Sequence, residues 1–223
     1  MTFSIVARDK TGAFGSAVCS SSPAVAARCI HVRDQVGVVN SQNVTDPRLG
    51  DKILDELNAG KSAQAALSRI TTTTDHIAYR QLLVLGPDGS GAVYSGPEAL
   101  GIVGEATAKD SVAGGNLLAD EQIPQIMVDA FEASTGELEQ RLLAAMQAAK
   151  QAGGEAGPVH SIGLSVARDA GWRVTDLRVD WTEGDPITEL ANLLELWIPQ
   201  RDDYVTRGHN PTSAPSYGVP GDE

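Results

Sequence analysis

The sequence is poor in aromatic, cysteine and positively charged residues, and each shortage excludes a class of protein. Only 4% of the 223 residues are aromatic while 42% are hydrophobic, so a core must be built from aliphatic side chains. Two cysteines, Cys19 and Cys29, are too few for a disulfide framework. With 17 Lys and Arg against 29 Asp and Glu, the net charge of −12 opposes binding to nucleic acid or to anionic membranes.

Long apolar runs and metal-ligand patterns are also missing. No run approaches the roughly 18 apolar residues of a membrane-spanning helix, and no signal-peptide pattern precedes Thr2. The four His show no ligand spacing, and no Cys-x-x-Cys, Gly-x-Gly-x-x-Gly or Walker loop occurs. We therefore expect a cytoplasmic protein with no metal, no cofactor, and neither nucleic-acid nor membrane partners.

Strand and turn signals dominate the start of the chain. Residues 3–7 and 13–19 predict two strands joined by a turn at Lys10-Thr11-Gly12, which together form a hairpin. Helices are predicted after Asp46-Pro47 and after Ser62, where short polar residues precede apolar residues at helical spacing. The other predicted elements are strands at 30–32, 36–40, 81–85, 92–94, 101–103, 110–112, 160–167 and 173–179, and helices at 123–131, 138–149 and 186–197.

These elements alternate in blocks, with pairs of helices between groups of strands. Simple βαβ winding would place one helix between parallel strands. Helix pairs between hairpins instead favour an α+β fold, in which two antiparallel sheets stack with a helix layer outside each (αββα). We expect one domain over residues 1–200 and an extended Pro/Gly-rich tail over 201–223 that contacts another subunit of a homo-oligomer.

Five stretches of the sequence carry a resemblance to a known family. They are Thr2-Phe3-Ser4-Ile5-Val6-Ala7-Arg8-Asp9, Ser20-Ser21-Ser22-Pro23-Ala24-Val25, Gln42-Asn43-Val44-Thr45-Asp46-Pro47-Arg48, Gly115-Asn116-Leu117-Leu118-Ala119 and Ala214-Pro215-Ser216-Tyr217-Gly218-Val219-Pro220-Gly221. The chain resembles, over nearly its whole length, a bacterial family of unknown function placed among the N-terminal-nucleophile (Ntn) hydrolases. These are αββα proteins that include proteasome β-subunits. The resemblance implies hydrolysis of an amide or other C–N bond, here in a small molecule.

Thr2 is the nucleophile that this resemblance implies. Once Met1 is removed, Thr2 carries a hydroxyl beside an α-amine whose ordinary pKa is about 7.7–8.0, so one residue supplies nucleophile and base. The alternative is that Met-Thr is merely a common start. Gly114-Gly115-Asn116, expected as a strand-to-helix loop, resembles the Gly-rich loop beside the proteasome nucleophile and would cradle the oxyanion, unless it is a plain turn. The proteasome lysine that lowers the amine pKa has no counterpart between Cys29 and Val36, where Arg33 stands.

Polar residues elsewhere in these stretches are further site candidates. Gln42 and Asn43 end a predicted strand, where short polar side chains face a site or simply decorate a helix entry. Ser20, Ser21 and Ser22 orient the Thr2 amine or a substrate carboxylate, or form a polar turn before Pro23. Substrate binding is also expected of four charged or titratable side chains, with surface or structural roles as the alternatives: Arg28, Asp46, Arg48 and His160.

Two other functions remain open. If Met1 is retained, the same pocket would activate water to hydrolyse a small amino or imino acid, as a deaminase does. His31, His160, Asp46 or Glu105 would then act as the base. The acidic surface, the apolar last helix with Trp197 and the tail fit a non-catalytic assembly or binding protein equally well.

Overall fold

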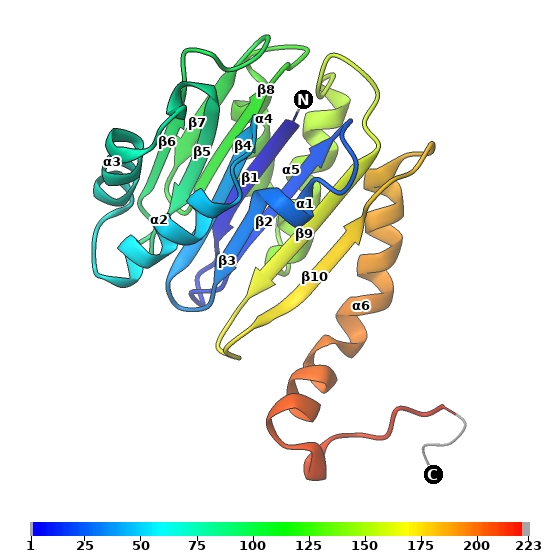
Figure 1. Cartoon of the computed structure of the whole chain (residues 1–223). Helices are drawn as coiled ribbons and strands as arrows, with labels where there is room; N and C mark the ends of the chain where they lie inside the picture. Colours follow the sequence, from blue (N-terminus) through cyan, green and yellow to red (C-terminus); the bar gives the residue numbers. More distant parts are fainter. Residues whose placement is uncertain (1, 220–223) are drawn as a thin grey trace.

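The computed structural model describes residues 2–219 of the chain (Figure 1). Its strands are β1 (Thr2–Arg8), β2 (Phe14–Ser20), β3 (Ile30–Arg33), β4 (Gly37–Asn43), β5 (Arg80–Leu85), β6 (Gly91–Ser95), β7 (Gly104–Ala108), β8 (Ser111–Asn116), β9 (Ser161–Ala167) and β10 (Arg173–Val179). Its helices are α1 (Ala26–Cys29), α2 (Arg48–Asn58), α3 (Ala63–Thr73), α4 (Ile123–Ala133), α5 (Leu138–Gln151) and α6 (Pro186–His209), with short 3-10 turns at Ile77–Tyr79 and Pro211–Ser213.

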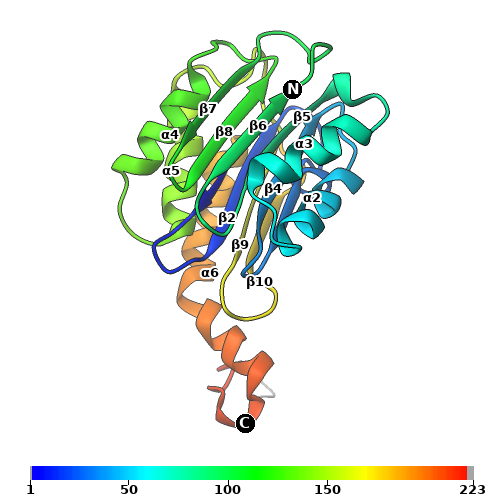
Figure 2. The ribbon, with the colours of Figure 1, turned by 90° about the vertical axis from the view of Figure 1, so that its left-hand side faces the viewer.

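The strands form two antiparallel sheets that stack face to face. One sheet has six strands in the order β10-β9-β2-β1-β8-β7, and the other has four in the order β3-β4-β5-β6. Helices α4 and α5 cover the outer face of the six-stranded sheet, while α2 and α3 cover the outer face of the four-stranded sheet (Figure 2). The fold is therefore the αββα sandwich expected from the order of elements, with β1 at the centre of the larger sheet.

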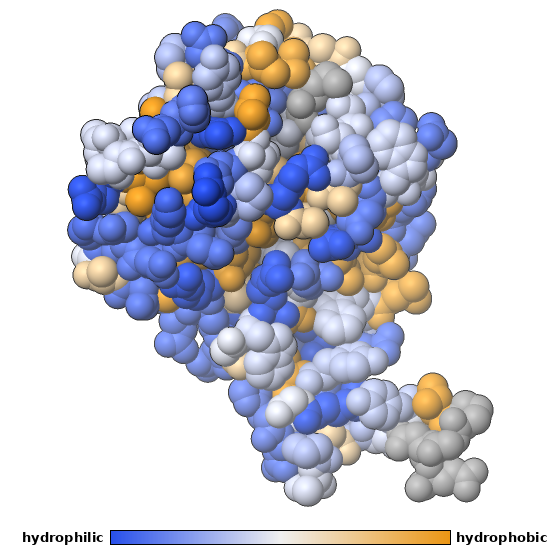
Figure 3. All heavy atoms as spheres, viewed as in Figure 1, coloured by the Kyte–Doolittle hydropathy of each residue, from blue (hydrophilic) through white to orange (hydrophobic). Residues whose placement is uncertain are grey.

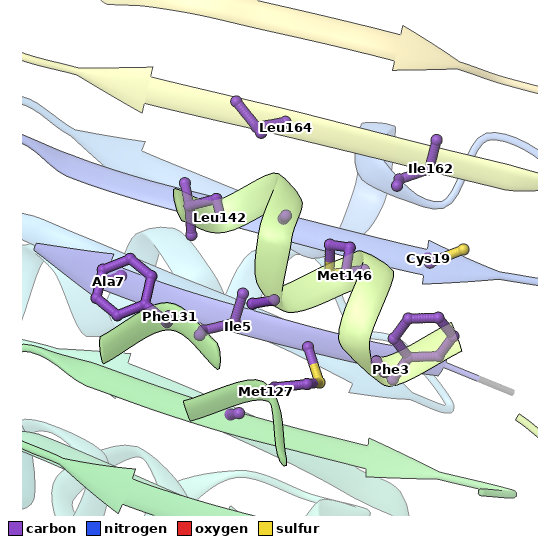
Figure 4. Close-up of a cluster of buried hydrophobic side chains, with 14 of the residues drawn as sticks. Phe3, Ile5, Ala7, Cys19, Met127, Phe131, Leu142, Met146, Ile162 and Leu164 are labelled. Atoms are coloured by element: carbon purple, nitrogen blue, oxygen red, sulfur yellow. The ribbon is translucent and has the colours of Figure 1, made fainter. Parts of the chain in front are cut away.

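The main core lies between the six-stranded sheet and its helices. Phe3, Ile5 and Ala7 of β1 point to the helix side, where Phe131 and Met146 pack against the sheet (Figure 4). Because successive strand residues face opposite sides, Thr2, Ser4 and Val6 point into the layer between the two sheets. This alternation decides which side chains of β1 are available to a site.

Helix ends follow local sequence signals. The Ser62 hydroxyl accepts the N–H of Ala65 at the start of α3, and the Asp46 carboxylate accepts the N–H of Arg48 at the start of α2. Gly60 follows α2 with φ +85°, a conformation that glycine adopts without strain.

Several element boundaries differ from the sequence prediction. β4 continues to Asn43, and the strands expected at 101–103 and 110–112 lie instead at Gly104–Ala108 and Ser111–Asn116. α6 continues to His209 instead of ending near Trp197, so the prediction of an extended chain from residue 201 is wrong for residues 201–209. The helix passes through Pro199, which lacks a backbone N–H to donate to the preceding turn.

A buried ion pair explains why α6 continues past Pro199. The guanidinium of Arg201 donates to Glu139 on α5 at 2.9 Å, and both side chains are at most 3% exposed. The Thr175 hydroxyl also donates to Glu139, and Trp197 Nε1 donates to that hydroxyl at 3.0 Å. These contacts fix α6 against β10 and α5.

Polar side chains predominate over α2 and α3, whereas apolar side chains reach the surface along α6 (Figure 3). Leu193 and Leu196 of that helix are 38% and 67% exposed. Within residues 2–219, no helix combines the length and apolar character needed to cross a bilayer.

Candidate functional site

Thr2 lies in a line of polar residues at one end of the six-stranded sheet. Ser20 pairs with Ser161, Thr2 pairs with Asn116, and Thr2 lies one position beyond the Phe3–Cys19 pair, which places it beside Ser20. By strand alternation all four polar side chains face the other sheet. We call Ser161, Ser20, Thr2 and Asn116 the polar row; each is at most 4% exposed.

The four-stranded sheet faces the polar row with side-chain amides. Gln42 Nε2 donates to Gln81 Oε1 at 2.8 Å, and Asn116 Nδ2 donates to the same oxygen at 3.1 Å. Gln81 Nε2 donates to Ser95 at 2.9 Å, and Ser4 donates to Gln42 Oε1 at 2.6 Å. Gln81 thus connects the two sheets beside Asn116, the register partner of Thr2. Gln81, Ser4 and Ser95 are members of this network that the sequence did not single out.

Gly115 belongs to β8, so the predicted strand-to-helix loop at Gly114-Gly115-Asn116 is wrong. A Cβ at Gly115 would lie 2.5 Å from Leu118 Cδ2 and 3.0 Å from the Thr2 carbonyl oxygen, and glycine is therefore needed for close packing against β1. In the turn that follows, Leu117 has φ +51° and donates its N–H to Leu100, and Leu118 donates to Ile102. These N–H groups are engaged in the fold, and the side-chain amide of Asn116 is left as the donor beside Thr2.

The serine cluster is divided between the row and the turn that leaves it. Ser20 is buried next to Thr2, whereas Ser21 and Ser22 are half-buried. Ser20 Oγ accepts the N–H of Ser22 at 3.0 Å, and Ser161 Oγ donates to the Ser22 carbonyl at 2.6 Å. The cluster therefore shapes the chain between β2 and α1 and brings only Ser20 into the row.

Asn43 has a different environment from its neighbour Gln42. Its Nδ2 donates to the Tyr79 carbonyl at 2.6 Å, and its Oδ1 accepts the N–H of Leu100 at 3.2 Å. Asn43 has φ +73°, a left-handed conformation that Asn tolerates. The structure thus shows Asn43 fastening two loops at the end of β4.

The candidate arginines already have partners. Arg28 donates to the carbonyls of Pro23 and Ala24 at 2.6 and 3.0 Å. Arg48 forms a two-point ion pair with Asp46 at 2.9 and 2.8 Å, and this hydrogen bonding lowers the pKa of the Asp46 carboxyl to about 2. If Arg28, Asp46 and Arg48 bind substrate as predicted, they must therefore give up these contacts for contacts with the substrate.

The candidate bases are dispersed. His160 donates through Nδ1 to the Thr182 carbonyl at 2.8 Å and stacks on Trp181, while its backbone N–H donates to the Ser20 carbonyl. His31 packs against Gly50 of α2, where burial lowers its pKa. Glu105 is exposed on the edge strand β7. Of these three residues, the structure ties only His160 to the polar row.

Glu155 is a candidate that sequence reasoning missed. It lies between α5 and β9, pairs with Leu118 in an isolated bridge, and is 3% exposed. Neither carboxylate oxygen has a hydrogen-bond partner among the described residues, and burial raises the pKa of the carboxyl, an effect that nearby Ser21 opposes in part. The signal that the sequence offers is an acidic residue enclosed by Gly153-Gly154 and Gly157-Pro158.

A cavity of about 590 Å³ lies at the opposite end of β1, lined in part by Arg8, Asp34 and Arg168. There Asp34 accepts three backbone N–H groups from residues 169–171 at 2.8–2.9 Å, which ties two loops together. No group of three or more His, Cys, Asp or Glu in the described part of the chain is placed to hold a metal ion.

Comparison with known proteins identifies one matching family and similar solved structures. The model of a family described as "Family of unknown function (DUF1028)" matches residues 2–190. The crystal structure of protein SPO2555 from Silicibacter pomeroyi, described with that family model, is 32% identical, has a TM-score of 0.82, and the match covers 87% of this chain and 88% of that one. No curated protein is significantly similar to the chain.

Two solved structures of Anbu proteins are also similar at low identity. A mutant from Hyphomicrobium sp. strain MC1 is 11% identical with a TM-score of 0.41, covering 90% of this chain and 96% of that one. The Anbu (ancestral beta-subunit) from Yersinia bercovieri is 10% identical with a TM-score of 0.41, covering 88% and 97%. At these identities and TM-scores, neither similarity bears on the chemistry of this chain.

Proposed function

The chain belongs to the DUF1028 family, and on that premise we propose that it is an Ntn-type hydrolase that cleaves an amide or other C–N bond in a small molecule, with Thr2 as nucleophile. One observation carries the proposal. Thr2 lies at the end of the central strand, inside a buried polar row, with the amide network of Gln42 and Gln81 beneath it. A hydroxyl in such a setting is desolvated and has neighbours that can fix a substrate.

Thr2 acts once the Met1–Thr2 bond is cut. Its Oγ attacks the substrate carbonyl carbon while its α-amine takes the hydroxyl proton. The C–N bond then breaks, the leaving nitrogen receives that proton, and the acyl group remains as an ester on Thr2. Water attacks the ester with the amine again as base, which releases the acid and restores the enzyme.

Asn116 supplies the oxyanion donor in this proposal. One Nδ2 hydrogen is held by Gln81 Oε1, which orients the amide and leaves the second hydrogen for the developing negative charge beside Thr2. Removing one such donor from a hydrolase lowers kcat by roughly 100- to 1,000-fold. Because Thr2 is only 4% exposed, the substrate in this proposal is a small molecule.

Two measurements test the proposal without a known substrate. Intact mass of the natively expressed protein should show loss of Met1, and incubation with a β-lactone should add one lactone mass at Thr2 as an ester. Thr2→Ala should abolish the addition and Thr2→Ser should retain it, because only serine keeps the hydroxyl. Thr11→Ala, an exposed threonine in the turn after β1, is the matched control and should label as the wild type does. Retention of Met1, or equal labelling of Thr2→Ala, excludes Thr2 as the nucleophile.

A further inference from the structure

We propose that Glu155 holds the α-ammonium of Thr2 in the processed protein and acts as a positioning residue for the nucleophile. The inference rests on the proposed function, because it requires a free Thr2 amine. It adds a residue from the segment between α5 and β9 to a site otherwise built from strand ends.

Backbone contacts place Glu155 at the start of β1. Ala156 donates its N–H to the Leu117 carbonyl at 2.9 Å, and Glu155 itself pairs with Leu118, so the segment follows the turn directly after Asn116. Asn116 is in turn the register partner of Thr2. On the preceding residue, Gly154, a Cβ would lie 3.3 Å from the Phe3 ring, which puts the segment over the first residues of β1.

Glu155 is a buried acceptor group that has Ser21 nearby but makes no hydrogen bond of normal geometry within residues 2–219. Its side chain is buried, and both oxygens are without hydrogen-bond partners within residues 2–219. A buried carboxylate in this condition destabilises the fold unless a positive group joins it. An acid kept in such a place therefore points to a cationic donor.

The charged and titratable groups around Glu155 do not supply that donor. Lys150 is already paired with Asp185 at 2.6 Å, and the Nδ1 of His160 is bound to the Thr182 carbonyl. On β2, Cys19 is a buried thiol whose pKa is raised first by burial and then by the charge of Glu155. The α-ammonium of Thr2, created by cleavage at Met1, is the cation that the site itself provides.

The pairing has a defined electrostatic effect. A carboxylate beside an ammonium favours the charged form, so it raises the pKa of the amine. The amine of the wild-type protein then becomes a free base at higher pH than an isolated α-amine. Its nitrogen is held near Glu155, with the Asn116 side chain on the neighbouring strand.

The experiment measures two pH profiles at Thr2, located by peptide mass: labelling of the α-amine by an amine-reactive anhydride and acylation of Oγ by a β-lactone. Compared with the wild type, Glu155→Gln should lower the midpoint of amine labelling by about one pH unit, because its amide is isosteric but uncharged. Glu155→Asp keeps the charge and should retain most of the raised midpoint. Glu105→Gln, the exposed control on β7, should leave the midpoint unchanged.

An unchanged midpoint in Glu155→Gln overturns the inference, whatever the lactone does. A free amine with a shifted midpoint but no acylation of Oγ supports the pairing and rejects the proposed nucleophile. An intact Met1–Thr2 bond overturns both. Thermal unfolding of each variant checks that the change is local.

Discussion

The two ends of the layer between the sheets are built from the same strands but lined by opposite kinds of side chain. Along the inner face of β5 the sequence passes from Gln81, in the amide network, to Leu83 and Leu85. Along β1 it passes from Thr2 and Ser4 to Val6 in the same way. The apolar end comprises Val6, Phe14, Val38, Leu83, Leu85 and Val112, and the polar end comprises Thr2, Ser4, Ser20, Gln42, Gln81 and Asn116.

The apolar end is expected to stabilise the fold, and the polar end is expected to carry the chemistry. Apolar burial stabilises the sandwich by roughly 25 cal/mol per Å² of surface removed from water. A buried amide adds little net stability and is costly if left unbonded. Even within the polar end the bonding is incomplete, since Asn116 Oδ1 has no partner among the described residues. Such groups persist where a site needs them, so the polar end is where function is expected.

The largest effect should come from the apolar end. Leu83→Ala leaves a cavity between the sheets and should lower the free energy of unfolding by about 3 kcal/mol, measured by urea denaturation. Thr2 labelling in the folded fraction should persist. Leu196→Ala, at an exposed leucine of α6, should change stability by less than about 0.5 kcal/mol. A loss below about 1 kcal/mol for Leu83→Ala would mean that this end is not a principal source of stability.

A somewhat smaller effect is expected at the centre of the polar end. Gln81→Met preserves volume but removes the acceptor that the amides of Gln42 and Asn116 share, and should cost about 2 kcal/mol. Unlike the leucine variant, it should also slow lactone labelling of Thr2, because Asn116 is no longer oriented. Gln64→Met on the exposed side of α3 is the control. If the labelling of Thr2 is unaltered, the amide network does not contribute to the reactivity of Thr2.

Ser4→Ala tests the same network one position further along β1. Loss of the hydroxyl that donates to Gln42 should cost about 1 kcal/mol in the same denaturation assay. In the double variant with Gln42→Ala the two costs should not add, since the residues share one hydrogen bond. Simple additivity would show that the contact carries no energy of its own.

The smallest effect concerns the Asp46–Arg48 pair at the entrance to α2. Because the folded-state pKa of Asp46 is lowered to about 2 from an ordinary 3.8, the pair stabilises the protein above pH 4, and this contribution disappears as the pH falls toward 2. Arg48→Gln should therefore be less stable than the wild type at pH 6, and the difference should nearly vanish by about pH 1, below the folded-state pKa. Since Arg48 is exposed, 1 M salt should shrink the difference. A difference that persists below the folded-state pKa would assign the effect to packing.

Local signals in the sequence predicted most of the fold. Alternating strands such as β1 and β10 and the Ser62 cap of α3 depend on neighbouring residues, and these predictions are confirmed. The end of α6 was not predictable, because Pro199 signals a stop while the buried partner that overrides it, Glu139, lies on another helix. The strand expected at 101–103 is wrong for a similar reason: Ile102 and the preceding Leu100 instead accept backbone N–H groups from the turn after β8.

The candidate site was also predictable only in part, because some of its residues meet through long-range contacts. Ser20 and Gln42 were named from strand ends, Thr2 from its place behind Met1 and Asn116 from a predicted loop, and sheet pairing and hydrogen bonds bring these four together. Gln81 and Glu155 join them only through long-range contacts that no local pattern encodes. The arginines were chosen by charge alone, and charge does not reveal which partner is already engaged.

Because β1 lies at the centre of its sheet, the residues around Thr2 are synthesised long after Thr2 itself. Thr2 pairs with Asn116, which is synthesised more than a hundred residues later. The partner of Ser20, Ser161, follows Ser20 by a still longer stretch of chain. At roughly 5–20 residues per second, the start of β1 spends on the order of ten seconds without these partners. Once the sheet closes, Thr2 is 4% exposed. Under the proposed function, the polar neighbours of the nucleophile are therefore complete only after β9 has been made.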